Sequence, residues 1–456
     1  MSRVRTNMLQ GPLLPSIISF AIPLALSSAL QLLFNAADLV VVGQFRGSDA
    51  LAAVGATSVL TNLVVNLFIG LSVGVSVVVA HSIGSGETSA THRAVHTALP
   101  TAIFSGVTLA LIGVVFSDLF LSWMDTPESI LPKAALYMRL YFCGMPFNMV
   151  YNYSAAILRA MGESKKPMYY LTLAGIVNVV LNVIFVTLLQ MDVDGVAIAT
   201  VISQGISAIL VVRALIRRTD AGKLELRKMR FYKKELLKII RIGLPSGIQG
   251  ILFNISNVLS QSSINSFGEF AISGVAAARN VEGFIKVVPA AFYHACMNFT
   301  GQNAGAHQYK RLLKVFGLCL LCSFSVTLCL SILMYAFGPT LLGIYIPDSQ
   351  EAILSGMMHF ATIGLFYCIC GLLDVSTGVL RGLGVSFLPM LMSILGICVF
   401  RIVWIMTVFQ IPAYHTLEHL FIVYPISWAV TFLAQAMTFF IIYRKRIGKD
   451  VHRLGT

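Results

Sequence analysis

The sequence of 456 residues is strongly apolar: 57% of its residues are hydrophobic and only 11% are charged. Soluble domains carry about 25% charged residues, so this composition excludes an ordinary soluble protein. The formal net charge is +13. The positive residues fall mostly between long apolar runs, so we attribute this charge to membrane topology and expect no nucleic-acid partner.

Twelve apolar stretches, each long enough to cross a bilayer as a helix, follow one another along the chain. We therefore predict an all-α integral membrane protein with twelve transmembrane helices. They are expected near residues 16–43, 50–81, 94–117, 132–157, 168–190, 195–216, 238–267, 271–301, 312–336, 352–380, 386–410 and 418–443.

Positive charge is distributed unevenly between the segments that connect these spans. Most of the 32 Lys and Arg residues fall on the side of the N-terminus, whereas only Arg46 and Lys133 fall in segments on the other side. Cytoplasmic loops carry an excess of Lys and Arg. We therefore expect a multi-pass protein of the cell (plasma or inner) membrane with both termini in the cytoplasm.

The chain contains an internal repeat. Pro23 in FAIPLA and Pro245 in RIGLPS lie 222 positions apart, and so do Arg159 in ILRAMG and Arg381 in VLRGLG. An even number of helices in each half would give both halves the same orientation, related by a pseudo-two-fold axis along the membrane normal. The expected domains are a six-helix lobe (1–216), a cytoplasmic basic linker (217–237) and a second six-helix lobe with a short basic tail (238–456).

The first predicted helix carries a polar face. Gln31, Asn35 and Asp38 recur every three or four residues within an apolar run, so they share one side of a helix. Hydrocarbon offers no hydrogen-bonding partners, and this face is therefore expected to meet protein or a wet cavity. Interhelical hydrogen bonding remains an alternative for Gln31 and Asn35. For Asp38 we favour a functional role, because a carboxylate is costlier in a membrane than an amide.

The fifth and sixth predicted helices add neutral oxygen atoms. Asn178 and Asn182 lie one turn apart, and Thr200 follows on the next helix. Together with one carboxylate these groups can form a small site for a cation or a proton, although hydrogen bonding between helices explains them equally well.

The second half differs from the first at the corresponding polar positions. Its first helix carries Asn254, Asn257 and Gln261, with Ser260 in the place of Asp38. Asp374 has Asn152 as its first-half equivalent. The two halves are therefore expected to differ in their chemistry.

One predicted helix holds three charges on a single face, namely Arg279, Glu282 and Lys286. This spacing favours a self-neutralised structural cluster over a second ion relay.

The P-loop of nucleotide binding and the H-E-x-x-H motif are absent from the sequence, and its G-x-S-x-G match, GLSVG (70–74), lies within an apolar run that is expected to span the membrane. We therefore expect neither an enzyme nor a cofactor, and uphill transport would have to use an ion gradient.

Several segments resemble the multidrug and toxic compound extrusion (MATE) family of bacterial efflux transporters, in order and along nearly the whole chain. They are AADLVVVG (36–43), DGVAIATVIS (194–203), FTGQNAGA (299–306) and the pair ILRAMG and VLRGLG. The resemblance implies two six-helix lobes and a secondary antiporter that exports small organic compounds, often cationic and aromatic, in exchange for Na⁺ or H⁺.

Position by position, the resemblance places the ion-coupling site on Asp38, Asn178, Asn182 and Thr200, with Asp38 as the ligand of any Na⁺. Some members carry a second acid where Asn182 stands, which leaves Na⁺ and H⁺ both open. The helix 7 acid of sodium-coupled members is replaced by Asn254, whereas their helix 10 acid is kept as Asp374. The residues expected around the substrate are Gln31, Asn35, Asn152, Asn254, Asn257, Gln261 and Asp374.

A lipid-linked oligosaccharide flippase of the same superfamily is the alternative. Its cavity should carry several cations for a pyrophosphate, whereas few lie within the predicted spans: Arg139, Arg279, Lys286 and Arg401. Besides a small organic substrate, the expected partner is membrane lipid, and the expected state is a monomer.

Overall fold

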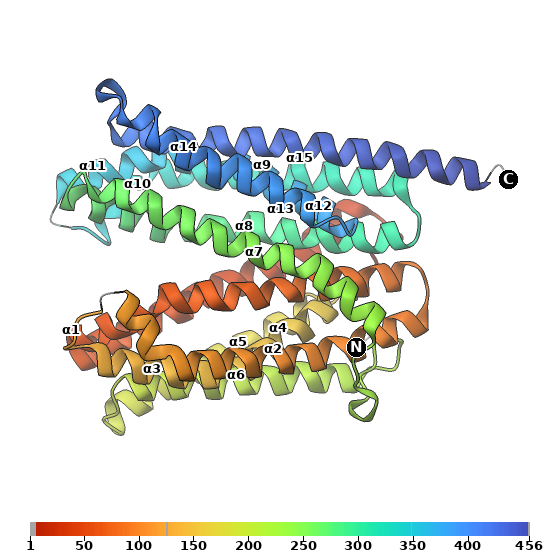
Figure 1. Cartoon of the computed structure of the whole chain (residues 1–456), viewed down its shortest axis with the longest axis horizontal. Coiled ribbons are helices and arrows are strands. Elements are labelled where there is room, and N and C mark those ends of the chain that lie inside the picture. Colours follow the sequence, from red (N-terminus) through yellow and green to blue (C-terminus); the bar gives the residue numbers. More distant parts are fainter. Residues whose placement is uncertain (1–5, 125, 348, 455–456) are drawn as a thin grey trace. The chain divides into compact units, whose positions relative to one another are not determined.

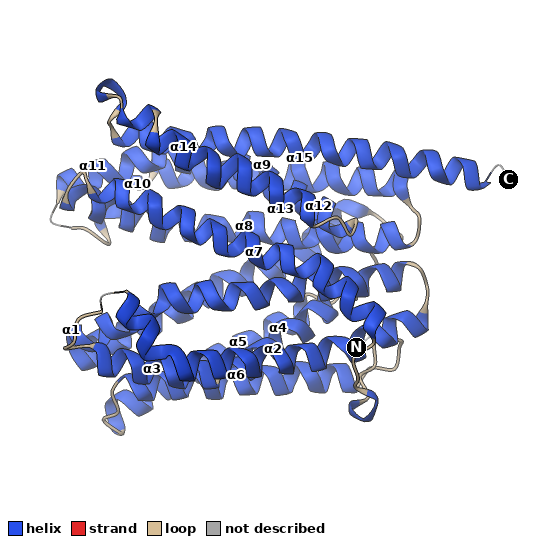
Figure 2. Cartoon of the chain, viewed as in Figure 1, coloured by secondary structure: helices blue, strands red, loops and turns tan. Residues whose placement is uncertain are grey.

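The computed structural model describes residues 6–124, 126–347 and 349–454, without the side chains of residues 48, 51, 58–60, 62, 63 and 447–454. Within these ranges the regular secondary structure is entirely helical (Figure 2). The predicted all-α class is confirmed.

Fifteen α-helices follow one another in the described residues (Figure 1). Short π-helical turns extend several of them, at Ile184–Leu188, Phe360–Gly364 and Ile394–Val399. The α-helices are α1 (Leu13–Gly84), α2 (Thr88–Trp123), α3 (Leu131–Cys143), α4 (Met145–Ala160), α5 (Lys165–Val183), α6 (Val193–Ile216), α7 (Lys233–Asn265), α8 (Glu269–Gly305), α9 (Tyr309–Ala336), α10 (Gly338–Gly343), α11 (Gln350–His359), α12 (Tyr367–Gly382), α13 (Phe387–Ser393), α14 (Phe400–Met406) and α15 (Leu417–Leu454).

Nine helical segments of the described chain are long and apolar enough to span a membrane, and the bent pair 350–364 and 367–382 makes a tenth. Two of the twelve expected spans do not meet these requirements of length and apolar character. The span expected at 132–157 is divided into α3 and α4, which have only 13 and 16 residues. The other is α8, whose sequence is interrupted by Arg279, Glu282 and Lys286.

The first two expected spans are joined without a loop. They form the single element α1, whose helical course breaks only at Gly47, with φ 81° and ψ −174°. Residues with a side chain rarely adopt a positive φ, so this glycine is what allows one helix to end and the next to begin at the same residue.

Two compact units divide the chain. The first comprises residues 26–247 together with Thr6, and the second comprises 7–25 and the described residues from Ile248 onward. Besides the boundary after Thr6, the divisions after residues 25 and 247 fall inside a helix, in α1 and in α7. Each division follows a repeat-related proline, Pro23 or Pro245, by two residues.

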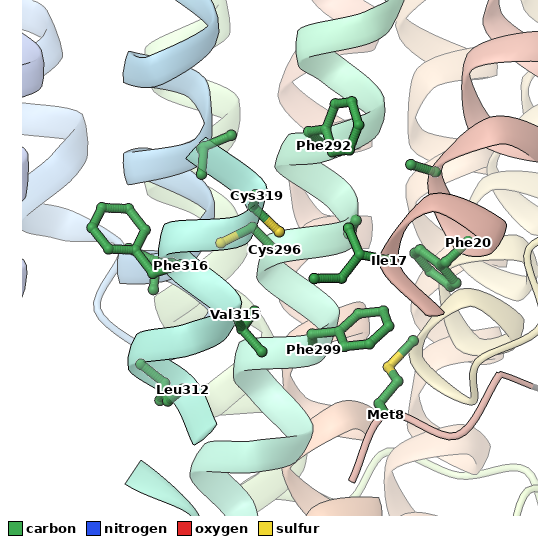
Figure 3. Close-up of a cluster of buried hydrophobic side chains, with 14 of the residues drawn as sticks. Met8, Ile17, Phe20, Phe292, Cys296, Phe299, Leu312, Val315, Phe316 and Cys319 are labelled. Atoms are coloured by element: carbon green, nitrogen blue, oxygen red, sulfur yellow. The ribbon is translucent and has the colours of Figure 1, made fainter. Parts of the chain in front are cut away.

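The second unit has a core to which the beginning of the chain contributes. Figure 3 shows Ile17 and Phe20 beside Phe299 of α8, and the rings of Phe20 and Phe299 meet edge to face with centroids 5.8 Å apart. Cys296 and Cys319 are fully buried in the same apolar cluster, as expected for cysteines that act as small apolar side chains.

In the first unit, the segment between α6 and α7 is bound to the start of α2. The backbone N–H of Glu225 donates to His96 Nε2 at 3.0 Å, and the N–H of Arg230 donates to the His96 carbonyl at 3.3 Å. Arg93 forms an ion pair with Glu235 at 2.8 Å. The basic linker is therefore a fixed part of this unit.

The loop after α4 is bound to the end of α6 through Glu163. Its carboxylate pairs with Arg218 at 2.7 Å and with Lys166 at 2.7 Å. Arg218 in turn donates to Asp220. This network ties the loop that follows ILRAMG to the basic segment.

Candidate functional site

A polar cavity of about 120 Å³ lies in the first unit, between α1, α4, α5 and α6. Six of the residues predicted from the sequence line it: Gln31, Asn35, Asp38, Asn152, Asn178 and Thr200. Asn182 does not line the cavity but donates a hydrogen bond from its side-chain amide to the Asp38 carboxylate. The structure therefore brings the first-lobe residues together.

The hydrogen bonds of this cavity leave oxygen atoms available. Asn178 donates to Thr200 Oγ1 at 3.4 Å, and Thr200 donates to the carbonyl of Val196 at 3.0 Å. Asn182 Oδ1 and Gln204 Oε1 are buried and accept no hydrogen bond from the described residues. A carboxylate with neutral amide and hydroxyl oxygens is a donor set that suits a small hard cation or a proton.

Close packing of α1 against α5 positions this site. A Cβ atom on Gly175 would lie 1.9 Å from the ring of Phe34, so glycine at this position allows the aromatic ring to approach α5 closely. Asn178 and Asn182 follow within the next two turns and are almost fully buried. Asp38, one turn beyond Phe34, thereby comes within hydrogen-bonding distance of α5.

Sequence reasoning missed several polar residues of the same cavity. Ser203 and Ser207 follow Thr200 at helical spacing on α6, and Asn148 precedes Asn152 by one turn on α4. Asn152 donates to the Asn148 side chain at 2.8 Å. The periodicity that revealed the polar face of the first helix is present on these helices too.

A larger cavity of about 520 Å³ lies in the second unit, between α7, α8, the α11–α12 pair, α14 and α15. Of the predicted residues, Asn257, Asp374 and the three charged residues of α8 line it. Asn254 and Gln261 do not. Gln261 instead accepts a hydrogen bond from Arg279 and donates to Asn265 at 2.9 Å.

The charges of α8 are partnered differently from the expected cluster. Glu282 bonds to His359 Nε2 at 2.8 Å and lies 3.8 Å from the Lys286 ammonium. Arg279 makes no ion pair with Glu282 among the described contacts and bonds to Gln261 instead. His359, only 2% exposed, was not anticipated, because nothing in its own apolar segment indicates a partner on α8.

Arg401 is a further charged residue of this cavity that sequence reasoning did not assign to a site. It is 4% exposed and donates from Nε to Ser427 Oγ at 3.2 Å. Its guanidinium carbon lies 3.8 Å from the ring centroid of Tyr424 and 5.8 Å from that of Trp428. The one available signal was a single arginine inside an apolar run.

An all-helical chain of repeated apolar spans, with a polar cavity among the helices of each unit, is the architecture of a polytopic membrane transporter. The comparisons with known proteins agree. The family model described as MatE matches residues 23–184 and 245–407. The chain belongs to this family, whose members are transporters and not enzymes.

Curated relatives cover most of the chain. The chain is 26% identical over 394 residues to the probable multidrug resistance protein YpnP of Bacillus subtilis (strain 168), covering 86% of this chain and 87% of the relative. It is 27% identical over 440 residues to the probable multidrug resistance protein YoeA of the same strain, covering 94% and 93%.

The fold is shared with solved structures. The outward-facing structure of a multidrug resistance MATE family transporter of the MOP superfamily matches with a TM-score of 0.88 at 22% identity, over 98% of this chain and 99% of that one. This match supports the predicted fold class of two helical lobes.

Proposed function

We propose that this chain is a secondary antiporter that exports small organic compounds in exchange for Na⁺ or H⁺ by alternating access, with ion coupling at Asp38. The observation that carries the proposal is the position of Asp38, the only charged side chain lining the first-unit cavity in the described chain. The names of its relatives as multidrug resistance proteins support drugs as the exported compounds.

An antiporter needs a group that binds the coupling ion more tightly in one conformation than in the other. We assign this role to Asp38, because its carboxylate on α1 accepts a hydrogen bond from Asn182 on α5 and so links the charge to the packing of two helices. A proton or Na⁺ on Asp38 neutralises the carboxylate and weakens the hydrogen bond from Asn182, because a bond to a charged acceptor is stronger than one to a neutral acceptor. The amide of Asn182 and the hydroxyl of Thr200 are the neutral groups proposed to complete the site.

The proposed setting is the cell membrane, with both termini in the cytoplasm. The positive residues that flank the spans support this orientation. The proposed working form is a monomer surrounded by lipid, because the chain already contains both repeats.

The test is transport in everted vesicles, with a fluorescent aromatic cation such as ethidium as the probe and either a Na⁺ or an H⁺ gradient imposed. The parental protein should export the dye with at least one gradient, and the Asp38→Asn variant should retain its fold but lose gradient-driven export. A matched control, Asp118→Asn, removes an exposed acid of α2 that lies outside the cavity. Export by Asp38→Asn at the parental rate would refute coupling at Asp38.

A flippase for lipid-linked oligosaccharides remains the second candidate. One observation favours it: three of the cations within the predicted spans gather around the cavity of the second unit, namely Arg279, Lys286 and Arg401. Translocation of a lipid pyrophosphate in proteoliposomes, without drug export in vesicles, would select this candidate.

A further inference from the structure

The cavities of the two units differ in the charges that line them. In the first unit the lining charge is Asp38 alone. In the second unit the acids Glu282 and Asp374 face three cations, Arg279, Lys286 and Arg401. Glu282 is already engaged by His359 and Lys286, so its charge is balanced within the wall of the cavity.

Two guanidinium groups of this cavity have only uncharged partners. Arg279 bonds to the amide oxygen of Gln261, and Arg401 bonds to Ser427 and lies over the ring of Tyr424. Among the described residues, no carboxylate oxygen lies within 4.0 Å of either one. Arg401 is the buried one of the two, and because burying a cation without a counter-charge is costly, an anionic ligand would offset that cost.

The internal repeat shows that these cations are not a requirement of the fold. At the 222-residue spacing, Arg401 corresponds to Val179 and Arg279 corresponds to Thr57. The first unit therefore has an uncharged residue at each of these positions, which indicates a role in binding for the cations of the second unit.

The remaining walls of the cavity are aromatic. Phe253, Tyr367, Tyr424 and Trp428 line it, and such rings provide stacking surfaces for a planar ligand. A volume of about 520 Å³ lies within the usual range of about 300–1,000 Å³ for small-molecule sites. The chemistry of the walls therefore suits an aromatic body with a negatively charged group.

We propose that the second-unit cavity binds an aromatic organic anion, whose phosphate or carboxylate contacts Arg401 and Arg279. This inference rests on the proposed export function and names its substrate class. Asp374 has no hydrogen bond or ion pair among the described contacts and lines the same cavity. Its negative charge opposes the anion, so removing it should strengthen anion binding and weaken the binding of a cation.

The proposal is tested by equilibrium binding to the purified full-length chain in lipid nanodiscs, with no ion gradient. The probes are 1-naphthyl phosphate as a soluble aromatic anion, farnesyl pyrophosphate as a lipid-linked one, and ethidium as an aromatic cation. Trp428 lines the cavity, so its fluorescence reports occupancy once the other two tryptophans, Trp123 and Trp404, are replaced by phenylalanine.

We expect 1-naphthyl phosphate or farnesyl pyrophosphate to quench Trp428, and the tighter of the two identifies the source of the phosphate. Arg401→Gln and Arg279→Gln should each weaken anion binding about tenfold or more, as for the loss of a charge-assisted hydrogen bond. Asp374→Asn should tighten it. Arg401→Lys keeps the charge and should fall between Arg401→Gln and the parent.

A matched control is Arg139→Gln, which removes an arginine of the first unit that lines neither cavity and pairs with Asp118. It should leave anion binding unchanged. Because Arg401 is buried and its removal can impair folding, Arg279→Gln provides the independent arm at a less buried position. Binding of ethidium but of neither phosphate, or weaker anion binding in Asp374→Asn, would overturn the proposal.

The binding experiment and the transport experiment can fail independently, so the two proposals can be distinguished. Absence of anion binding in a protein that still exports ethidium under a gradient would refute this inference and leave antiport standing. Anion binding without export of any probe would refute antiport and leave the substrate class standing.

Discussion

The side-chain amide of Asn182 donates a hydrogen bond to the carboxylate of Asp38, which lies 144 positions earlier in the chain. This bond joins α5 to α1 at the polar cavity of the first unit. Since the Asn182 side chain is completely buried, the amide has no water to replace Asp38 as its acceptor. A change in the charge of Asp38 on α1 therefore alters the hydrogen bonding of Asn182 on α5.

We predict that Asn182→Ala shifts the ion dependence of efflux without abolishing binding of the exported compound. Losing the donor removes a hydrogen bond to a charged group, worth about 1.5–3 kcal/mol. This bond stabilises the unprotonated carboxylate, so the H⁺ concentration required for half-maximal efflux should fall by about tenfold or more if the coupling ion is H⁺. If the coupling ion is Na⁺, loss of the Asn182 oxygen proposed as a ligand should instead raise the Na⁺ concentration required. The measurement is dye efflux in everted vesicles over a series of Na⁺ concentrations and pH values. Asn148→Ala, which alters an amide of the same cavity on α4, is the control; equal effects of both variants would contradict a specific role for Asn182.

A second prediction concerns the buried contact between Glu282 and His359. Glu282→Gln and His359→Gln should each lower the unfolding temperature, because each leaves a buried polar partner incompletely bonded. The double variant should lose less than the sum of the single changes, since both single changes break one interaction. Thermal unfolding of the purified protein measures all three, with the exposed acid variant Glu128→Gln as the control. Additive losses would show that the two side chains stabilise the protein independently.

The Glu163 network outside the spans should make stability depend on pH. Burial acts to raise the pKa of Glu163, but the hydrogen bonds and charges of Lys166 and Arg218 outweigh it and hold this pKa below its ordinary value. A carboxyl with a lowered pKa in the folded state stabilises the protein above its unfolded pKa of about 4.3, and this contribution disappears as pH falls through the folded pKa.

We therefore predict that the unfolding temperature of the parent declines below about pH 4.3 more steeply than that of Glu163→Gln. At pH 7 the variant should be the less stable of the two, and the difference should shrink in acid. The measurement is thermal unfolding from pH 3 to pH 7 in detergent. A constant difference across this range would show that Glu163 does not contribute through its ionised form.

Topology can be tested by cysteine accessibility. In a background with the exposed cysteines Cys143 and Cys329 replaced by serine, Ser129→Cys should react with an impermeant thiol reagent added outside intact cells. Lys223→Cys, in the segment bound to α2, should react only after permeabilisation. Labelling of Lys223→Cys from outside would refute the cytoplasmic placement of that segment.

Sequence periodicity was sufficient to predict much of the first-unit cavity. The polar face of the first helix, Gln31, Asn35 and Asp38, needed only the spacing of an α-helix. The resemblance then placed Asn178 and Thr200, which line the same cavity. The all-α class followed from apolar runs of spanning length, because a chain in lipid must satisfy its backbone within helices.

The second-unit cavity was less predictable because its contacts cross between distant helices. Glu282 and His359 lie 77 positions apart, and the residue pattern of neither helix indicates that these two side chains are in contact. The spacing of the charges on α8 predicts a self-neutralised cluster, whereas Arg279 and Arg401 have neutral partners. The basic linker was identified by composition, but its hydrogen bonds to His96 depend on backbone geometry that composition does not contain.

Two of the boundaries between the compact units, those after residues 25 and 247, lie one repeat apart. In each half of the chain, the first segment of the first helix belongs to the unit formed mostly by the other half. Residues 7–25 belong to the second unit, and the start of α7, up to residue 247, belongs to the first. A single half made alone would lack the segment that completes its unit and would leave an apolar surface such as that around Phe299 uncovered. Two separate chains, one ending and the other beginning within the basic linker, should therefore associate when made in the same cell, because each supplies the segment that completes the unit of the other.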